Sequence, residues 1–177
     1  AYDPEVSRGC WGQCNVGDPA HTPYRVRPIQ HVVSGLEALR HRQVDFIRFI
    51  DDTFPLGKEM IGALEDWVHT LGRQPHFFCE LRLDQLRNTD LLSRFARIGL
   101  CDVFVGAESG SRAELARFDK NIDVASLPKQ VRVLRRLGVN VFVGLLLNAR
   151  SQTRGDLEDT LRLAISTEAA GFYPTFV

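Results

Sequence analysis

Segments with strand periodicity alternate with segments of helical periodicity along the whole chain. The pattern predicts strands at residues 4–9, 44–52, 76–83, 101–109, 139–148 and 172–177, and amphipathic helices at 28–41, 58–71, 89–99, 123–138 and 153–171. Strand-helix units of roughly 25 to 40 residues are typical of a parallel sheet covered by helices. An open doubly wound sheet and a barrel both satisfy this alternation. No G-x-G-x-x-G follows the first strand, so we predict an α/β fold, a partial (β/α)6 TIM-like barrel.

Length and composition favour one domain with a single core. The chain has 177 residues, of which 44% are hydrophobic, and its 22 basic residues balance 22 acidic ones. This neutral balance favours neither nucleic acid nor an anionic membrane, so we expect a small-molecule or unknown substrate. No apolar run approaches the roughly 20 residues of a membrane span, and no signal peptide is evident, which predicts a cytoplasmic protein. Because the chain begins with Ala1 and its only methionine is Met60, we expect residues 1–177 to be part of a longer chain.

Polar side chains follow the predicted strands at their carboxyl ends. In parallel α/β architectures, the carboxyl ends of the strands are where the chemistry collects. The residues at these positions are Cys10 and Cys14 after the first strand, Asp51 and Asp52 after the second, Glu80, Arg82 and Asp84 on the third, Glu108 and Ser109 at the end of the fourth, and Asn148 at the end of the fifth. Together they predict a polar rim above an apolar floor.

Six short motifs occur in a characteristic order. They are "SRGCWGQC", "YRVRPIQHVVSGLEAL", "FIDDTFPL", "CELRLD", "GAESGSRAELARFDKNI" and "LEDTLRLA". In this order they resemble the radical S-adenosylmethionine (radical SAM) superfamily, most closely the subgroup often joined to a cobalamin-binding domain. The resemblance implies a [4Fe-4S] cluster held by the three thiolates of C-x-x-x-C-x-x-C, with one iron open to SAM. One electron from the cluster then splits the sulfonium of SAM to give a 5′-deoxyadenosyl radical.

The cluster motif of this chain departs from the family pattern. Cys10 and Cys14 match the first two metal ligands, but the third position holds Gly17, which has no side chain. Two thiolates would leave two irons without a protein ligand, so the resemblance implies a labile cluster. Asp18 and His21 are close enough in sequence to ligate iron, although neither stands at the expected offset. Cys79 and Cys101 are expected to be buried free thiols.

The resemblance also implies cofactor-binding residues. Val16 precedes the third ligand position, where the family backbone lies beside the adenine. Asp51 and Asp52 match the strand end that meets the methionyl amino group, and a solvated turn is the alternative. Glu108, followed by Ser109, matches a position that faces SAM. Glu80 and Arg82 either contribute to this pocket or form an ion pair inside the barrel. After the fifth strand "NARSQT" replaces the family's "GLPGET", so a second part of the SAM pocket is altered.

Three functions are consistent with these residues. The first is a radical SAM enzyme core that binds a [4Fe-4S] cluster and SAM and starts radical chemistry on an unknown substrate. Such an enzyme needs an electron donor such as flavodoxin or ferredoxin, and cobalamin would require a domain that this sequence does not contain. The second is a degenerate, inactive barrel that serves as a binding or scaffold module. The third is a plain or zinc-binding α/β domain, with Cys10, Cys14, Asp18 and His21 as the zinc ligands.

Overall fold

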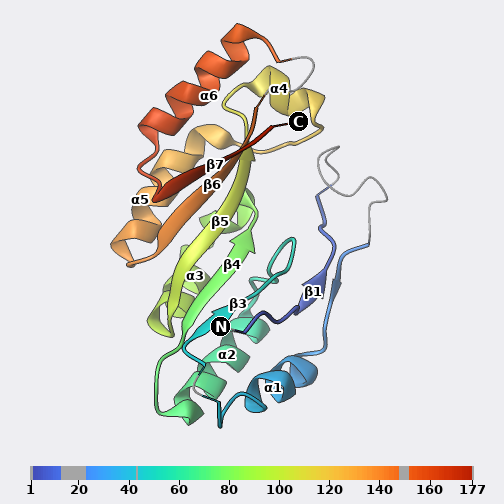
Figure 1. The fold of residues 1–177 in the computed structure, drawn as a ribbon, viewed down its shortest axis with the longest axis vertical. Helices are drawn as coiled ribbons and strands as arrows, with labels where there is room; N and C mark the ends of the chain where they lie inside the picture. The colour runs from blue at the N-terminus through green and yellow to red at the C-terminus, as the bar shows by residue number, and fades with distance from the viewer. Residues whose placement is uncertain (1, 13–22, 43, 148–151, 177) are drawn as a thin grey trace.

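A five-stranded parallel sheet forms the centre of the molecule. The computed structural model describes residues 2–12, 23–42, 44–147 and 152–176. The strands are β3 (Phe46–Arg48), β4 (His76–Leu81), β5 (Leu100–Glu108), β6 (Asn140–Leu147) and β7 (Gly171–Phe176), and they pair in chain order, all parallel. Figure 1 shows them ascending from β3 to β7 as a curled half-barrel. The predicted fold class, a partial TIM-like α/β barrel, is confirmed.

The N-terminal segment lies beside the sheet instead of forming its sixth full strand. β1 (Ser7–Arg8) pairs antiparallel with β2 (Arg25–Val26), and this hairpin lies to the right of the sheet in Figure 1. A single parallel bridge, between Tyr2 and Ile47, connects this segment to β3. Pro4 has no N–H to donate, which interrupts a longer ladder. The prediction of six strands is therefore wrong for the described part of the chain, where the sheet has five.

Helices connect the strands. They are α1 (Ile29–Glu37), α2 (Lys58–Leu71), α3 (Thr89–Arg97), α4 (Arg112–Arg117), α5 (Leu127–Arg136) and α6 (Arg154–Ser166), with 3-10 turns η1 (Leu83–Arg87) and η2 (Val124–Ser126). α5 begins at Leu127, four residues later than the predicted helix, after the η2 turn, and Pro128 stands in its first turn. Asn88 caps α3, because its side chain accepts from the Leu91 N–H. The short helix α4 was not predicted.

The last helix ends five residues earlier than predicted. α6 stops at Ser166, and Thr167 is extended and donates its hydroxyl to the Leu163 carbonyl at 2.8 Å. The Ala170 N–H already bonds to the Val141 carbonyl at 2.8 Å, so the chain runs alongside β6 before Gly171. The predicted helix end at Gly171 is wrong, because a β-branched residue and the edge of the sheet end the helix first.

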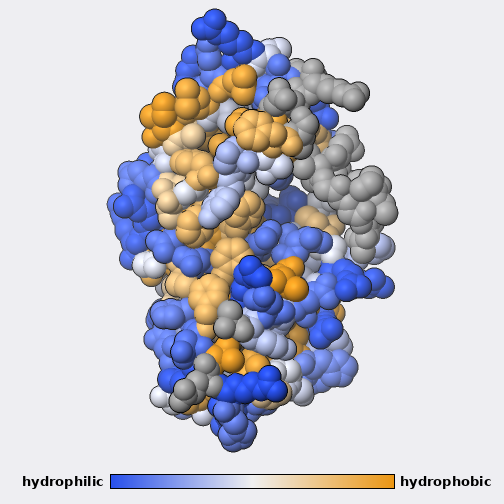
Figure 2. Space-filling model, in the orientation of Figure 1, coloured by the Kyte–Doolittle hydropathy of each residue, from blue (hydrophilic) through white to orange (hydrophobic). Residues whose placement is uncertain are grey.

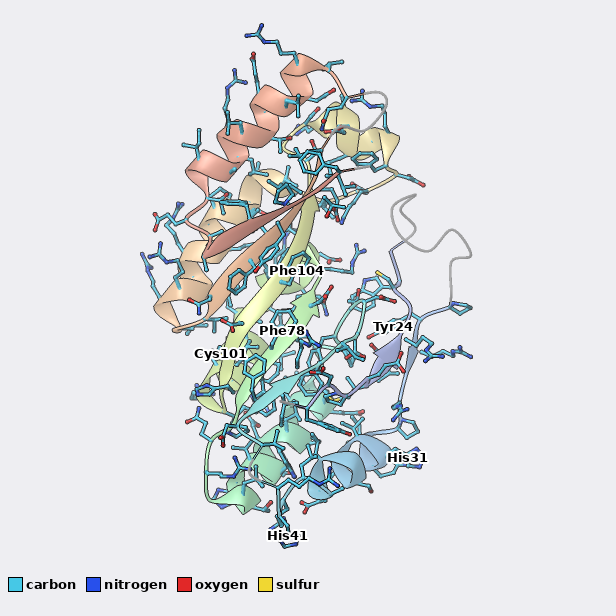
Figure 3. The ribbon with its side chains drawn as sticks, viewed as in Figure 1. Tyr24, His31, His41, Phe78, Cys101 and Phe104 are labelled. Carbon is cyan, nitrogen blue, oxygen red and sulfur yellow. The ribbon has the colours of Figure 1, made fainter. Side chains whose placement is uncertain are left out.

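The two faces of the sheet differ in burial. One face carries fully buried side chains, among them Ile47, Phe77, Val103 and Val143, and its aromatic cluster of Phe49, Phe54, Phe77 and Phe95 has ring centroids 4.8–5.8 Å apart. The other face carries half-buried rings, including Phe78, Phe104 and Phe142. Figure 3 labels two of these rings on the sheet, and Figure 2 shows apolar side chains along the middle of the same view. This second face is an apolar floor that leads to the carboxyl ends of the strands.

None of the helices in the described ranges combines the length and apolar character needed to cross a membrane.

Candidate functional site

The Cys10 thiol lies at the carboxyl end of β3, held by groups from three parts of the chain. Its Sγ accepts from the Thr53 hydroxyl at 3.1 Å, from the Gly12 N–H at 3.3 Å and from Nη1 of Arg82 at 3.8 Å. Burial opposes ionisation of the thiol, but these three donors outweigh it and lower the pKa of Cys10 below its ordinary value. The arrangement favours a thiolate, which is the form that ligates soft metals and reacts as a nucleophile.

Arg82 joins the cysteine segment to the end of β4. Its guanidinium lies 5.7 Å from the centroid of the Trp11 ring and pairs with Asp84 at 3.1 Å. Trp11 packs edge-on against Tyr24, with centroids 4.7 Å apart, and Figure 3 shows Tyr24 beside the N-terminal hairpin. The alternative role predicted for Glu80 and Arg82, an ion pair between them, is not found in the described part of the chain. Arg82 pairs with Asp84 instead.

The neighbouring residues Asp51 and Asp52 occupy opposite environments. Asp51 is 2% exposed, and its Oδ1 accepts from the N–H of Val6 at 2.9 Å and from the N–H and the hydroxyl of Ser7. Burial raises the pKa of Asp51, and the bonds from Ser7 and Val6 partly offset this rise. Asp52 is exposed. Of the two predicted cofactor-binding carboxylates, Asp52 is therefore the one that faces outward.

Glu80 adds a second carboxylate near this end of the sheet. It is half-buried on β4, on the same face as Phe78. Burial raises the pKa of Glu80, and the negative charges of Asp52 and Asp51 raise it further. The three acids are thus close enough for the charges of Asp51 and Asp52 to act on Glu80.

Glu108 ends β5 in a left-handed backbone conformation, with φ of +63°. Its carboxylate pairs with the ammonium of Lys120, and the two side chains are each 14% exposed. A Cβ at Gly106 would collide with this carboxylate and come within 3.2 Å of Lys120 Nζ. Sequence reasoning identified Glu108 but missed Lys120. Beside this pair, α4 and residues 119–124 line an open cavity of about 680 Å³ that reaches Lys120.

Ser109 lies in the junction between α6 and the residues that lead into α4. It is fully buried, its hydroxyl lies 3.0 Å from the Thr160 hydroxyl, and it accepts from the Ser111 N–H at 3.0 Å. The Asp156 carboxylate reinforces the same junction, because it accepts from Ser111 and Arg117. In this structure Ser109 positions the loop after β5, and its role in cofactor binding stays a prediction.

Cys79 and Cys101, the other two cysteines in the described ranges, have environments different from that of Cys10. Cys79 is fully buried, and burial raises the pKa of its thiol well above the ordinary value. Cys101 is half-buried, donates to the Phe77 carbonyl at 3.3 Å and has a pKa of about 11, mainly because of burial. Both are free thiols, as the sequence predicted.

Several predicted site residues fall outside the described ranges. They are Cys14, Val16, Gly17, Asp18, His21 and Asn148. In the part of the chain that the structure does describe, no three His, Cys, Asp or Glu side chains are grouped closely enough to hold a metal ion. The predicted cluster ligands and the alternative zinc ligands therefore stay predictions.

Known proteins share both the sequence pattern and the fold. The anaerobic magnesium-protoporphyrin IX monomethyl ester cyclase of Cereibacter sphaeroides is 26% identical over 167 residues, which cover 91% of this chain. This chain spans 27% of the length of that relative. No family model matches the chain.

Solved structures with the same half-barrel are more distant in sequence. The cobalamin-dependent S-adenosylmethionine radical enzyme OxsB is 20% identical with a TM-score of 0.78, over 91% of this chain and 26% of that one. The radical S-adenosylmethionine methyltransferase TsrM from Kitasatospora setae is 16% identical with a TM-score of 0.80, over 99% of this chain and 34% of that one. These likenesses show that the chain has the same half-barrel fold as these radical S-adenosylmethionine enzymes, and they support the resemblance that the ordered motifs carry.

Proposed function

We propose that this core binds a [4Fe-4S] cluster and SAM at the carboxyl ends of its strands and starts radical chemistry on a small molecule. The observation that carries the proposal is the Cys10 thiol, which three hydrogen-bond donors favour as a thiolate at the site where the motif requires a metal ligand. Anionic thiolates are the ligands that hold iron-sulfur clusters. The donor chemistry of Cys10 therefore fits the group.

The ligand set fits the cluster only in part. Cys10 and Cys14 would hold it, and Gly17 supplies no third thiolate. We therefore expect a cluster that is assembled incompletely and lost readily. When bound with SAM, the cluster would supply the electron that splits the sulfonium.

The chain's own residues would bind and orient SAM. Asp52 is the exposed carboxylate at the end of β3 and suits the methionyl ammonium. Glu108, fixed by Lys120 and Gly106, offers a second acceptor at the end of β5. The half-buried rings Phe104 and Phe142 supply the apolar floor, which limits water beside a reactive intermediate.

The test is electron paramagnetic resonance of the anaerobically reconstituted, reduced protein with and without SAM. We expect a cluster signal that changes when SAM is added, that strengthens in Gly17→Cys and that disappears in Cys10→Ser. A cluster signal that does not change on addition of SAM in any of the proteins would overturn the proposal that the core binds SAM. A cluster signal that persists in Cys10→Ser would overturn the assignment of Cys10.

A further inference from the structure

Asp51 accepts three hydrogen bonds at the rim, all from groups of the protein itself. Oδ1 accepts from the N–H groups of Val6 and Ser7 and from the Ser7 hydroxyl at 2.8 Å. Oδ2 is buried and has no partner among the described residues. A ligand approaching from the rim therefore meets neither carboxylate oxygen, because one is saturated and the other is enclosed.

The Ser7 hydroxyl extends this network toward the thiol. Its single proton can be donated either to Asp51 Oδ1 or to the Thr53 carbonyl oxygen, which lies 2.9 Å away and accepts from the Tyr24 hydroxyl at 3.3 Å. The hydroxyl of the same Thr53 donates to Cys10 Sγ at 3.1 Å. Asp51 thus fixes Ser7, which stands three residues before Cys10, and Ser7 in turn fixes the residue that donates to the thiol.

We propose that Asp51 is a positioning residue, which docks the segment before Cys10 onto the end of β3 and so sets the place of the Cys10 sulfur. This assigns the two adjacent acids different tasks: Asp51 holds the protein together, while exposed Asp52 is left for a ligand. The placement of the sulfur stands on the geometry alone. The inference that this placement of the Cys10 sulfur helps metal binding rests on the proposed function.

Four variants test this role. Asp51→Ala removes the acceptor, whereas Asp51→Asn keeps an oxygen that can accept the same bonds from Val6 and Ser7. Asp52→Ala is the matched control, because it removes the neighbouring acid and leaves the network intact. Ser7→Ala removes the hydroxyl that lies between Asp51 Oδ1 and the Thr53 carbonyl, and it leaves the backbone N–H bonds to Asp51 in place.

The main readout is amide hydrogen exchange of Gly12, whose N–H donates to Cys10 Sγ and therefore reports the position of the sulfur. In Asp51→Ala we expect this amide to exchange faster by about tenfold or more, while core amides such as Val103 keep their protection. Asp51→Asn should restore the protection, and Asp52→Ala should not lower it. A merely structural residue would change all amides together.

The second readout is Cd²⁺ binding, followed by the thiolate-to-cadmium absorbance, since Cd²⁺ is a soft ion that prefers thiolates. We expect weaker binding in Asp51→Ala and unchanged binding through Cys10 in Asp51→Asn. If wild type binds no Cd²⁺, the metal part of the proposed function is overturned, and Gly12 exchange still decides the positioning role. Unchanged Gly12 exchange in folded Asp51→Ala overturns the positioning role. If that variant does not fold, unchanged exchange in Ser7→Ala overturns it.

Discussion

Lys120 and Glu108 form an ion pair at the end of β5, and each side chain is 14% exposed. Three features hold the carboxylate in one place: the pairing itself, the left-handed backbone of Glu108 and the absence of a side chain at Gly106. A non-glycine residue with positive φ is uncommon and costs backbone energy, so the surrounding contacts must maintain it. The rim therefore presents a fixed acceptor and not a freely moving acid.

Lys120→Met should destabilise the protein, because it leaves the half-buried Glu108 carboxylate without its cation. We expect a loss of about 1–3 kcal/mol in the free energy of unfolding, measured with urea. The double variant Lys120→Met with Glu108→Gln should recover part of this loss, because no unpaired charge remains. Equal losses in the single and double variants would contradict the pairing.

Gly106→Ala should destabilise through steric conflict. The added methyl would meet the Glu108 carboxylate and Lys120, and we expect a cost of about 1–3 kcal/mol. Gly35→Ala is the matched control, since a Cβ at Gly35 in α1 meets nothing within 4 Å and should stabilise by about 0.5–1 kcal/mol. Urea unfolding of both variants checks the contrast, and a neutral Gly106→Ala would refute the close approach.

The described cysteines should react with iodoacetamide in the order Cys10, Cys101, Cys79 at neutral pH. The pKa of Cys10 is lowered by its three donors despite burial, whereas burial raises the pKa of Cys101 to about 11 and encloses Cys79 completely. Only thiolates react. Mass spectrometry of the metal-free protein over time gives the order, and labelling of Cys101 as fast as Cys10 would contradict it.

Asp156 should contribute stability that depends on pH. The Ser111 hydroxyl, followed by the N–H and hydroxyl of Thr153, lowers the pKa of Asp156 below its ordinary value of 3.8. Because the folded pKa lies below the unfolded one, the contribution is complete above 3.8 and is lost progressively as the pH falls below that value through the lower pKa of the folded state. The difference in unfolding free energy between wild type and Asp156→Asn should therefore shrink in acid. A difference that is constant with pH would contradict this assignment.

The alternation of strands and helices could be predicted because it depends on local periodicity and on caps. α5 starts four residues after its predicted first residue, with Pro128 in its first turn. Helix α4 was missed because six residues are too few to show a period, although Ser111 and Glu114 have the spacing of a capping box and the Ser111 side chain does cap the helix. The end of α6 depends on Thr167 and on pairing with β6, which a local pattern does not contain.

The features of the candidate site that depend on contacts between distant residues could not be predicted from local sequence patterns either. The sequence analysis expected Asp51 to meet a cofactor or to lie in a solvated turn, whereas the structure buries it against Val6 and Ser7. Those two partners lie more than 40 positions away in the sequence, so a local pattern does not contain the contact. No sequence pattern around Lys120 indicates a role at the site. Its pairing with Glu108, 12 positions earlier, arises only when the residues after α4 fold back against the end of β5. The bonds of Thr53 and Arg82 to Cys10 likewise join residues more than 40 positions apart and arise only in the folded chain.

The most direct test of the central claim is the content of iron and acid-labile sulfide per chain after anaerobic reconstitution. We expect wild type to take up part of a [4Fe-4S] complement through Cys10 and Cys14, Gly17→Cys to reach a full complement, and Cys10→Ser to take up neither iron nor sulfide. This result would establish the rim beside Thr53 and Arg82 as an iron-sulfur site. Equal iron and sulfide in all three proteins, or none even in Gly17→Cys, would contradict the account.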